Sequence, residues 1–199
     1  MTWVMFDYGG VICSPQPAQD LAAMAALVGS RVPEFRDAYW ARRLAYDLAE
    51  LTAEDYWRAT LAQVGRRWDR ALTAELSSLD TASWMHLQPG TLRLIEDLAA
   101  RGTRLAVLSN APCDVAESVA ALPVSSHFEH LLFSCYLRAA KPDPLCFRKA
   151  LARLGADPAD VIFIDDRAGN VDAAARLGIH AIRFTSAAAV RARLPVHLI

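Results

Sequence analysis

The stretch Val4-Met5-Phe6-Asp7-Tyr8-Gly9-Gly10-Val11-Ile12 decides the fold of this chain. The apolar run before the acid is typical of a short strand that is buried on both faces. Asp7 then lies at the carboxyl end of that strand, where ligands bind in open α/β sheets. Gly9 and Gly10 let the backbone turn sharply and present amide N–H groups to whatever Asp7 faces. Taken alone, the stretch also fits a strand that ends in an ordinary turn.

The composition limits the classes of function. The chain has 199 residues, 54% hydrophobic and 22% charged, which suits one domain of ordinary size or a core with a modest insert. Its net charge of -1 provides no field for nucleic acid or for an anionic membrane. Its apolar runs fall short of the roughly 20 residues of a spanning helix. We therefore expect neither nucleic acid nor a membrane as a partner.

The cysteines indicate the compartment. Four are present without C-x-x-C spacing, and they resemble the reduced thiols of a cytosolic protein: Cys13, Cys113, Cys135 and Cys146. The chain also starts directly into its first strand, which leaves no room for a signal peptide. We expect a cytoplasmic protein.

The order of expected elements divides the chain into two parts. Helical spacing recurs over residues 20–28, 33–48, 53–61 and 72–85, with an N-cap expected at Thr52. From Pro89 onward, helices at 91–100, 114–121, 144–154 and 171–177 alternate with strands at 104–108, 131–134, 161–164 and 179–184. This alternation predicts an α/β fold, a Rossmann-like parallel sheet with helices on both faces. Residues 1–13 and 87–199 would form the core domain, and residues 14–86 a helical domain inserted after the first strand.

Three expected strands end in polar residues. Asp7, Ser109-Asn110 and Asp165-Asp166 should meet in one crevice, because parallel strands share one carboxyl edge. Lys141 lies in a loop before a helix and stands out, because nearly all other cations of the chain are arginine. Such a set suits attack on phosphorus: a carboxylate can form an acyl phosphate, Mg²⁺ binds carboxylates and phosphate oxygens, and lysine offsets phosphate charge.

Four motifs carry a resemblance to a known family. The stretches Phe6-Asp7-Tyr8-Gly9-Gly10-Val11, Leu108-Ser109-Asn110, Lys141-Pro142 and Ile164-Asp165-Asp166-Arg167-Ala168-Gly169-Asn170 resemble, in order, the motifs of the haloacid dehalogenase (HAD) superfamily. The insert resembles the helical C1 cap of that family (subfamily I). Residues 46–57 are similar to the cap of a phosphatase branch with sugar-1-phosphatase-like members.

The resemblance implies a hydrolase with Mg²⁺ as cofactor and a small phosphate ester as substrate, working as a monomer or homodimer. It implies Asp7 as nucleophile and metal ligand, with the carbonyl group of Gly9 as a further ligand. It implies Asp166 as the main acidic metal ligand, with Asp165 beside it and Asn170 nearby.

The same resemblance implies the phosphate site. Ser109 and Asn110 would hold phosphate oxygens, together with the backbone at Gly10. Lys141 would neutralise Asp7 and the phosphoryl group in transfer.

One position departs from the family pattern. Phosphatases of this superfamily usually carry a second aspartate two residues after the nucleophile, as general acid and then base, but here that residue is Gly9. General acid–base help contributes roughly 10²–10⁴-fold. We therefore expect a preference for leaving groups that need little protonation, such as anomeric sugar phosphates or acyl phosphates, unless a residue of the cap supplies the proton.

Two alternatives stay open. The first is a haloacid dehalogenase-like hydrolase that acts at carbon, although the paired acids Asp165-Asp166 favour a phosphatase. The second is a catalytically weak protein that binds a phosphorylated metabolite or a partner, because Gly9 cannot transfer a proton. Within the insert we expect Arg42, Arg43 and Asp47 on a solvated helix face. We expect most of the aromatic residues in its core: Tyr39, Trp40, Tyr56, Trp57, Trp68 and Trp84.

Overall fold

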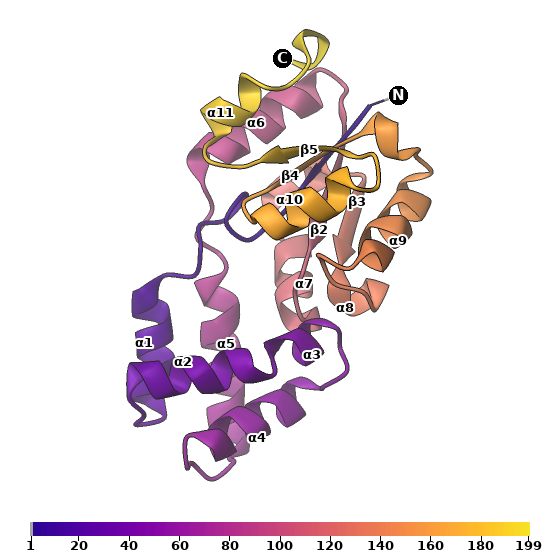
Figure 1. Ribbon diagram of the computed structural model, residues 1–199. Coiled ribbons are helices and arrows are strands. Elements are labelled where there is room, and N and C mark those ends of the chain that lie inside the picture. The colour runs from indigo at the N-terminus through magenta and orange to yellow at the C-terminus, as the bar shows by residue number, and fades with distance from the viewer. Residues whose placement is uncertain (1) are drawn as a thin grey trace.

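The computed structural model describes residues 2–199 and has a parallel five-stranded sheet at its centre (Figure 1). The strands are β1 (Trp3–Phe6), β2 (Arg104–Ser109), β3 (His130–Phe133), β4 (Val161–Asp165) and β5 (His180–Arg183), in the spatial order β3-β2-β1-β4-β5. The first strand of the chain is the central one, because it pairs with both β2 and β4. The expected α/β fold is thus confirmed.

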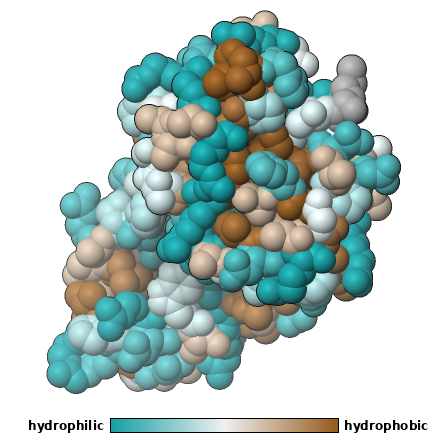
Figure 2. Space-filling model, turned by 45° about the horizontal axis from the view of Figure 1, so that its top comes forward, coloured by the Kyte–Doolittle hydropathy of each residue, from teal (hydrophilic) through white to brown (hydrophobic). Residues whose placement is uncertain are grey.

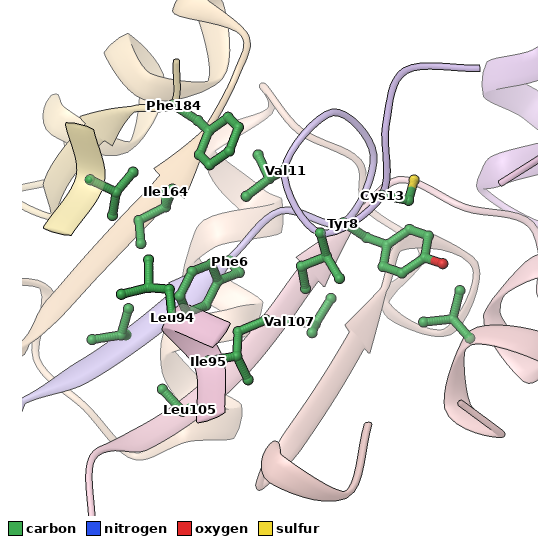
Figure 3. Packing of buried hydrophobic residues seen from close by; sticks show 14 of the residues in the cluster. Phe6, Tyr8, Val11, Cys13, Leu94, Ile95, Leu105, Val107, Ile164 and Phe184 are labelled. Carbon is green, nitrogen blue, oxygen red and sulfur yellow. The ribbon is translucent and has the colours of Figure 1, made fainter. Parts of the chain in front are cut away.

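Helices cover both faces of the sheet. On one face, Phe6 of β1 packs among residues of α6 (Pro89–Ala100) such as Leu94 and Ile95 (Figure 3). Residues of α7 (Cys113–Ala120) and α11 (Ala187–Arg191) complete this cluster. On the other face, Met5 packs with residues of α9 (Pro144–Leu154) and α10 (Ala168–Ala175). Because successive side chains of a strand point to opposite faces, β1 contributes to both clusters and must be apolar throughout.

The helical insert has a hydrophobic cluster of its own. It comprises α1 (Ala18–Leu27), α2 (Val32–Ala41), α3 (Arg43–Asp47), α4 (Ala53–Gln63) and α5 (Arg70–Ser83), which we call the cap. Tyr39, Tyr56 and Trp57 lie at its centre and are fully buried. Thr52 caps α4 in a reciprocal pair with Asp55, as expected from the sequence. In Figure 1 the cap lies below the sheet, away from the chain termini.

Two adjacent chain segments connect the cap to the sheet. Cys13 and Leu87 form an isolated antiparallel bridge. The N–H of Ser14 donates to the carbonyl of His86 at 2.8 Å, and the N–H of Gln88 donates to the carbonyl of Ile12 at 2.9 Å. This crossing point and the separate cluster support the division that we propose, a cap domain of residues 14–86 and a core domain of residues 1–13 and 87–199.

Some element boundaries differ from those expected. The single helix expected over residues 33–48 is broken into α2 and α3 at Arg42, whose φ of -125° is not helical. The break turns α3 toward the core, where the Tyr46 hydroxyl donates to Asp114 at 2.7 Å. The short helix α8 (Ser134–Leu137) begins where the expected strand 131–134 ends, and α11 was not expected. The described residues also include three short 3-10 helices, at Pro123–His127, Pro158–Asp160 and Val196–Leu198.

The surface shows hydrophobic residues on both lobes of the molecule. In the face drawn in Figure 2, brown patches interrupt the hydrophilic surface of the core and of the cap, the smaller lobe at lower left. Within residues 2–199, no helix is long and apolar enough to cross a membrane.

Candidate active site

Asp7 lies immediately after β1, at the carboxyl edge of the sheet, and only 6% of its surface is exposed. Its Oδ1 accepts hydrogen bonds from the backbone N–H of Tyr8 at 2.7 Å and faces Lys141 Nζ, also at 2.7 Å. Burial raises the pKa of Asp7 to about 7, although Lys141 opposes this effect. Asp7 is therefore a buried carboxyl group with the lysine Lys141 beside it.

Lys141 is almost fully buried between two carboxylates. Its Nζ lies 2.7 Å from Asp7 Oδ1 and 2.8 Å from Asp165 Oδ2, and it donates to the carbonyl of Leu108 at 2.7 Å. Burial by itself lowers the pKa of Lys141, but the two carboxylates raise it above its ordinary value. Lys141 therefore stays protonated and supplies a fixed positive charge beside Asp7.

Asp165 lies behind Lys141 and is fully buried. Its two oxygens accept from Asn170 Nδ2 at 3.0 and 2.9 Å, and Oδ1 also accepts the backbone N–H of Arg167 at 2.8 Å. Because both oxygens already have donors, these contacts favour a positioning role for Asp165 on Lys141. The expected metal role of Asp165 stays a prediction.

Ser109 is the last residue of β2 and Asn110 follows it; both line the same cavity as Asp7. The Asn110 side chain is engaged, because its Nδ2 donates to the carbonyl of Lys141 at 2.8 Å and its Oδ1 accepts the N–H of Lys141 at 2.9 Å. Asn110 thus holds the backbone of Lys141 in place. If Asn110 contacts phosphate, the contact would come from its backbone, because its side chain is bound to Lys141.

Asp166 has the features of a cation ligand. Its Oδ1 is buried and has no hydrogen-bond partner among the described residues. Oxygen atoms of Asp7, Asp165 and Asp166 lie within 4.8 Å of one another, and Lys141 pairs with Asp7 and Asp165. Gly10, at φ +80°, makes room for this carboxylate, because a Cβ there would lie 2.5 Å from Asp166 Oδ2. Clustered oxygen ligands with one unpartnered atom fit a hard divalent cation such as Mg²⁺.

Trp84, in the connection between cap and core, covers Gly9, and this contact could not be predicted from the sequence. A Cβ at position 9 would contact Trp84 Cζ3 at 3.4 Å. The indole of Trp84 donates to Asp80 at 3.2 Å, which fixes the ring at this place. The position at which the family carries its usual general acid is therefore bounded by an aromatic ring.

Gln88 is a second residue that sequence reasoning missed. Its Nε2 lies 3.1 to 3.2 Å from the carbonyl oxygens of Gly10, Val11 and Cys13. A single amide group thus holds the turn that follows Asp7. The one feature of the sequence that could have pointed to Gln88 is its position directly before Pro89, where the chain returns from the cap to the core.

The expectation that Arg43 and Asp47 lie on a solvated helix face is wrong. Both are buried, with 5% and 8% of their surfaces exposed. Arg43 pairs with Asp47 at 2.8 Å and with the fully buried Asp80 at 2.9 Å. Asp80 comes from α5, far along the chain, so the pairing could not be recognised from the pattern of α3 alone.

Core and cap together enclose a cavity of about 650 Å³. Of the residues expected at the site, all but Asp165 line it: Asp7, Gly9, Gly10, Ser109, Asn110, Lys141 and Asp166. Trp40 and Trp84 line it as well, so two of the aromatic residues assigned to the cap core face the cavity instead. Such a volume is typical of sites for small molecules and exceeds what a phosphate group alone requires.

These features define a class of enzyme, one with a Rossmann-like core and an acidic site at the strand ends beneath a helical cap. A family model described as haloacid dehalogenase-like hydrolase matches residues 1–178, and the chain belongs to this family of hydrolases.

Several characterised proteins are similar to this chain. The Acyl-CoA dehydrogenase family member 10 of Mus musculus is 29% identical over 194 residues, a match that covers 90% of this chain and 17% of that protein. The phosphoglycolate phosphatase of Pectobacterium atrosepticum is 26% identical over 187 residues, covering 90% of this chain and 78% of that enzyme. The chain thus spans only a small part of the first relative and most of the second.

A solved structure shares the fold. The wild-type HAD family enzyme bt-2542 of Bacteroides thetaiotaomicron, in complex with magnesium and inorganic phosphate, is 20% identical with a TM-score of 0.72. The match covers 92% of this chain and 93% of that one. At 20% sequence identity, this similarity shows a shared fold and nothing more.

Proposed function

We propose that this hydrolase is a Mg²⁺-dependent phosphatase that cleaves a small phosphorylated metabolite through an aspartyl-phosphate on Asp7. The observation that carries the proposal is the pairing of Asp7 Oδ1 with Lys141 Nζ at 2.7 Å, beside the unpartnered Oδ1 of Asp166. A nucleophilic carboxylate, a fixed cation and an open metal ligand are the groups that phosphoryl transfer requires.

Each residue then has a role in the first step. A carboxylate oxygen of Asp7 bonds to phosphorus while the bond from phosphorus to the leaving oxygen breaks, and that oxygen takes the electron pair. The Ser109 hydroxyl and the backbone at Gly10 and Asn110 bind phosphate oxygens. Lys141 offsets the negative charge that accumulates as Asp7 and the phosphoryl group approach each other. Water then attacks phosphorus and releases phosphate and Asp7.

The metal has a defined set of ligands in this proposal. Asp7, Asp166 and the carbonyl oxygen of Gly9 would hold Mg²⁺. When bound, the ion supplies charge that neutralises phosphate oxygens and orients the phosphoryl group toward Asp7. Asp165 would keep Lys141 in position, and its oxygens lie within the same acidic cluster.

Gly9 and Trp84 limit the kind of leaving group that the substrate can have. Because neither can give a proton to an alkoxide, we propose that the substrate has a leaving group that needs little protonation. The similarity of the cap to that of sugar-1-phosphatase-like members of the C1-capped branch makes anomeric sugar phosphates one such class, and acyl phosphates are another.

Hydrolysis of p-nitrophenyl phosphate by the wild type and by Asp7→Asn, with Mg²⁺ and with a chelator, tests the proposal. This substrate has a good leaving group, so it probes nucleophile and metal without the missing acid. We expect turnover that requires Mg²⁺ and falls at least about a thousandfold in Asp7→Asn.

Two other outcomes identify the alternatives. Release of halide from a 2-haloacid without added metal, and no phosphatase activity, would favour the hydrolase that acts at carbon. Stabilisation by inorganic phosphate without turnover of any substrate would favour the protein that only binds a phosphorylated metabolite.

A further inference from the structure

The cap presents one side of the cavity as a row of mostly apolar side chains. Val32, Arg36, Trp40 and Leu44 line the cavity at intervals of four residues along α2 and into α3. Residues four apart on a helix lie on the same face, so Val32, Arg36 and Trp40 share one face of α2. Leu44 lies on α3, beyond the break at Arg42, and lines the same cavity. Three of the four are large apolar side chains that are exposed to solvent, Val32 by 40%, Trp40 by 43% and Leu44 by 58%.

This exposure is unusual for the molecule. Six large hydrophobic side chains are exposed among the described residues, and three of them belong to this single row. Exposed apolar residues that gather at a cavity mark binding surfaces, whereas scattered ones need no explanation. Because the row lies on the cap and the phosphate site lies on the core, the row faces the part of the substrate beyond the phosphate.

Most polar side chains of the cap that line the cavity already have partners; the exception is Arg36 of the row, which is exposed and lies 4.0 Å from Asp37 Oδ1. Arg43 is paired with Asp47 and Asp80. Gln16 donates through Nε2 to the hydroxyls of Tyr39, at 3.2 Å, and Ser83, at 2.8 Å. A sugar has several hydroxyl groups, and each one that is buried without a partner weakens binding. An apolar group has no such requirement.

We infer that the substrate of this site is an aromatic phosphate, a phosphate ester of a phenol or a similar planar apolar group, whose ring packs on Trp40 and Leu44. The inference rests on the proposed function and narrows its substrate class. A phenolic oxygen is also a leaving group that departs without a proton donor, which agrees with the aromatic ring of Trp84 over Gly9. An aromatic phosphate thus has an apolar group that can pack on the row and a leaving group that needs no general acid.

Two pairs of compounds separate this inference from the proposed function. Phenylphosphonate and 2-naphthylphosphonate cannot be hydrolysed, so calorimetric titration in Mg²⁺ measures binding alone. Phenyl phosphate and 2-naphthyl phosphate measure turnover, and their leaving groups are similar in acidity but differ by one fused ring. We expect 2-naphthylphosphonate to bind about tenfold more tightly than phenylphosphonate, because the extra ring is buried on the row. For the same reason, kcat/KM should be about tenfold higher for 2-naphthyl phosphate than for phenyl phosphate.

Leu44→Asn is the variant that tests the row, and Leu145→Asn is its matched control. Both leucines are exposed, by 58% and 45%, but Leu145 lies on α9 and does not line the cavity. We expect the tenfold preference for the naphthyl compound to fall to twofold or less in Leu44→Asn and to persist in Leu145→Asn. Trp40→Ala should act like Leu44→Asn, and unfolding in urea verifies that each variant is folded.

Three results would overturn the inference. They are equal or undetectable binding of the two phosphonates to the wild type, a naphthyl preference that Leu44→Asn and Trp40→Ala leave intact, or a higher kcat/KM for α-D-glucose 1-phosphate than for 2-naphthyl phosphate. Preferential binding of the naphthylphosphonate without hydrolysis of any phosphate would uphold the aromatic subsite and overturn the proposed phosphatase.

Discussion

Gly10 is the residue on which the position of Asp166 depends. We expect Gly10→Ala to impair Mg²⁺-dependent activity at least tenfold and to weaken Mg²⁺ binding, because the new Cβ would lie 2.5 Å from the carboxylate. A φ of +80° adds a backbone cost of about 1–2 kcal/mol for any side chain. Activity against Mg²⁺ concentration and calorimetric titration of Mg²⁺ measure the two effects.

Gly29→Ala is the matched control for Gly10→Ala. Gly29 has a similar φ of +67°, but a Cβ there would meet no atom within 4 Å. The control should therefore lose a comparable amount of stability and keep its response to Mg²⁺. If both variants bind Mg²⁺ as the wild type does, Asp166 does not depend on Gly10.

Gly9 and Trp84 form a pair whose members must change together. A carboxylate introduced by Gly9→Asp meets the ring of Trp84, since even its Cβ would lie 3.4 Å from Cζ3. We expect Gly9→Asp alone to give no gain with glycerol phosphate. The double variant Gly9→Asp, Trp84→Ala should raise the rate with glycerol phosphate relative to p-nitrophenyl phosphate by at least about tenfold. An equal gain in the single variant would show that Trp84 does not block this position.

At the scale of elements, α3 and α5 are joined through buried charges. Arg43→Met leaves Asp80 fully buried without its cation, and we expect a loss of about 3–5 kcal/mol in the free energy of unfolding. Arg42→Met is the control, because Arg42 is exposed and, among the described residues, its side chain makes one hydrogen bond, to Gln63 at 3.5 Å. Urea unfolding measures both. A loss in Arg43→Met that does not exceed the control would contradict the structural role of the pair.

The helices and strands could largely be predicted from the sequence, because their signals are local. The apolar runs of β1 and β4 and the Thr52–Asp55 cap of α4 each occupy a few consecutive residues. The break at Arg42 could not be predicted, because it depends on contacts of α3 with the core, such as Tyr46 with Asp114. Pairings between distant segments leave no periodic pattern.

At the scale of the molecule, Ser134 connects cap and core. Its hydroxyl donates to the carbonyl of Asp47 in α3 at 2.6 Å and accepts the N–H of Ala111, next to the proposed phosphate site, at 3.0 Å. We expect Ser134→Ala to cost about 1–3 kcal/mol of stability and to speed amide hydrogen exchange in α3. Ser126→Ala, an exposed serine that bonds only Pro123, should change neither. Unchanged exchange in α3 would mean that the contact does not hold the cap.

The core half of the site could be predicted and the cap half could not. Asp7, Ser109 and Asp166 lie at the carboxyl ends of strands, and parallel strands bring these ends to one edge whatever lies between them in the chain. The cap side chains that line the cavity, such as Trp40 and Arg43, are placed by packing of helices against one another. A tryptophan in an amphipathic helix has the same local pattern whether it faces the core of the cap or the substrate.

The central claim is that Asp7 is the nucleophile, and trapping the covalent intermediate tests it most directly. The wild type is mixed with Mg²⁺ and a substrate whose phosphate group carries an isotopic label. The reaction is quenched in acid during turnover, and the protein is digested for mass spectrometry. We predict a phosphoryl group on the peptide that contains Asp7, and none in Asp7→Asn. Turnover with a phosphoryl group on another residue, or with phosphorylation that persists in Asp7→Asn, would contradict the account.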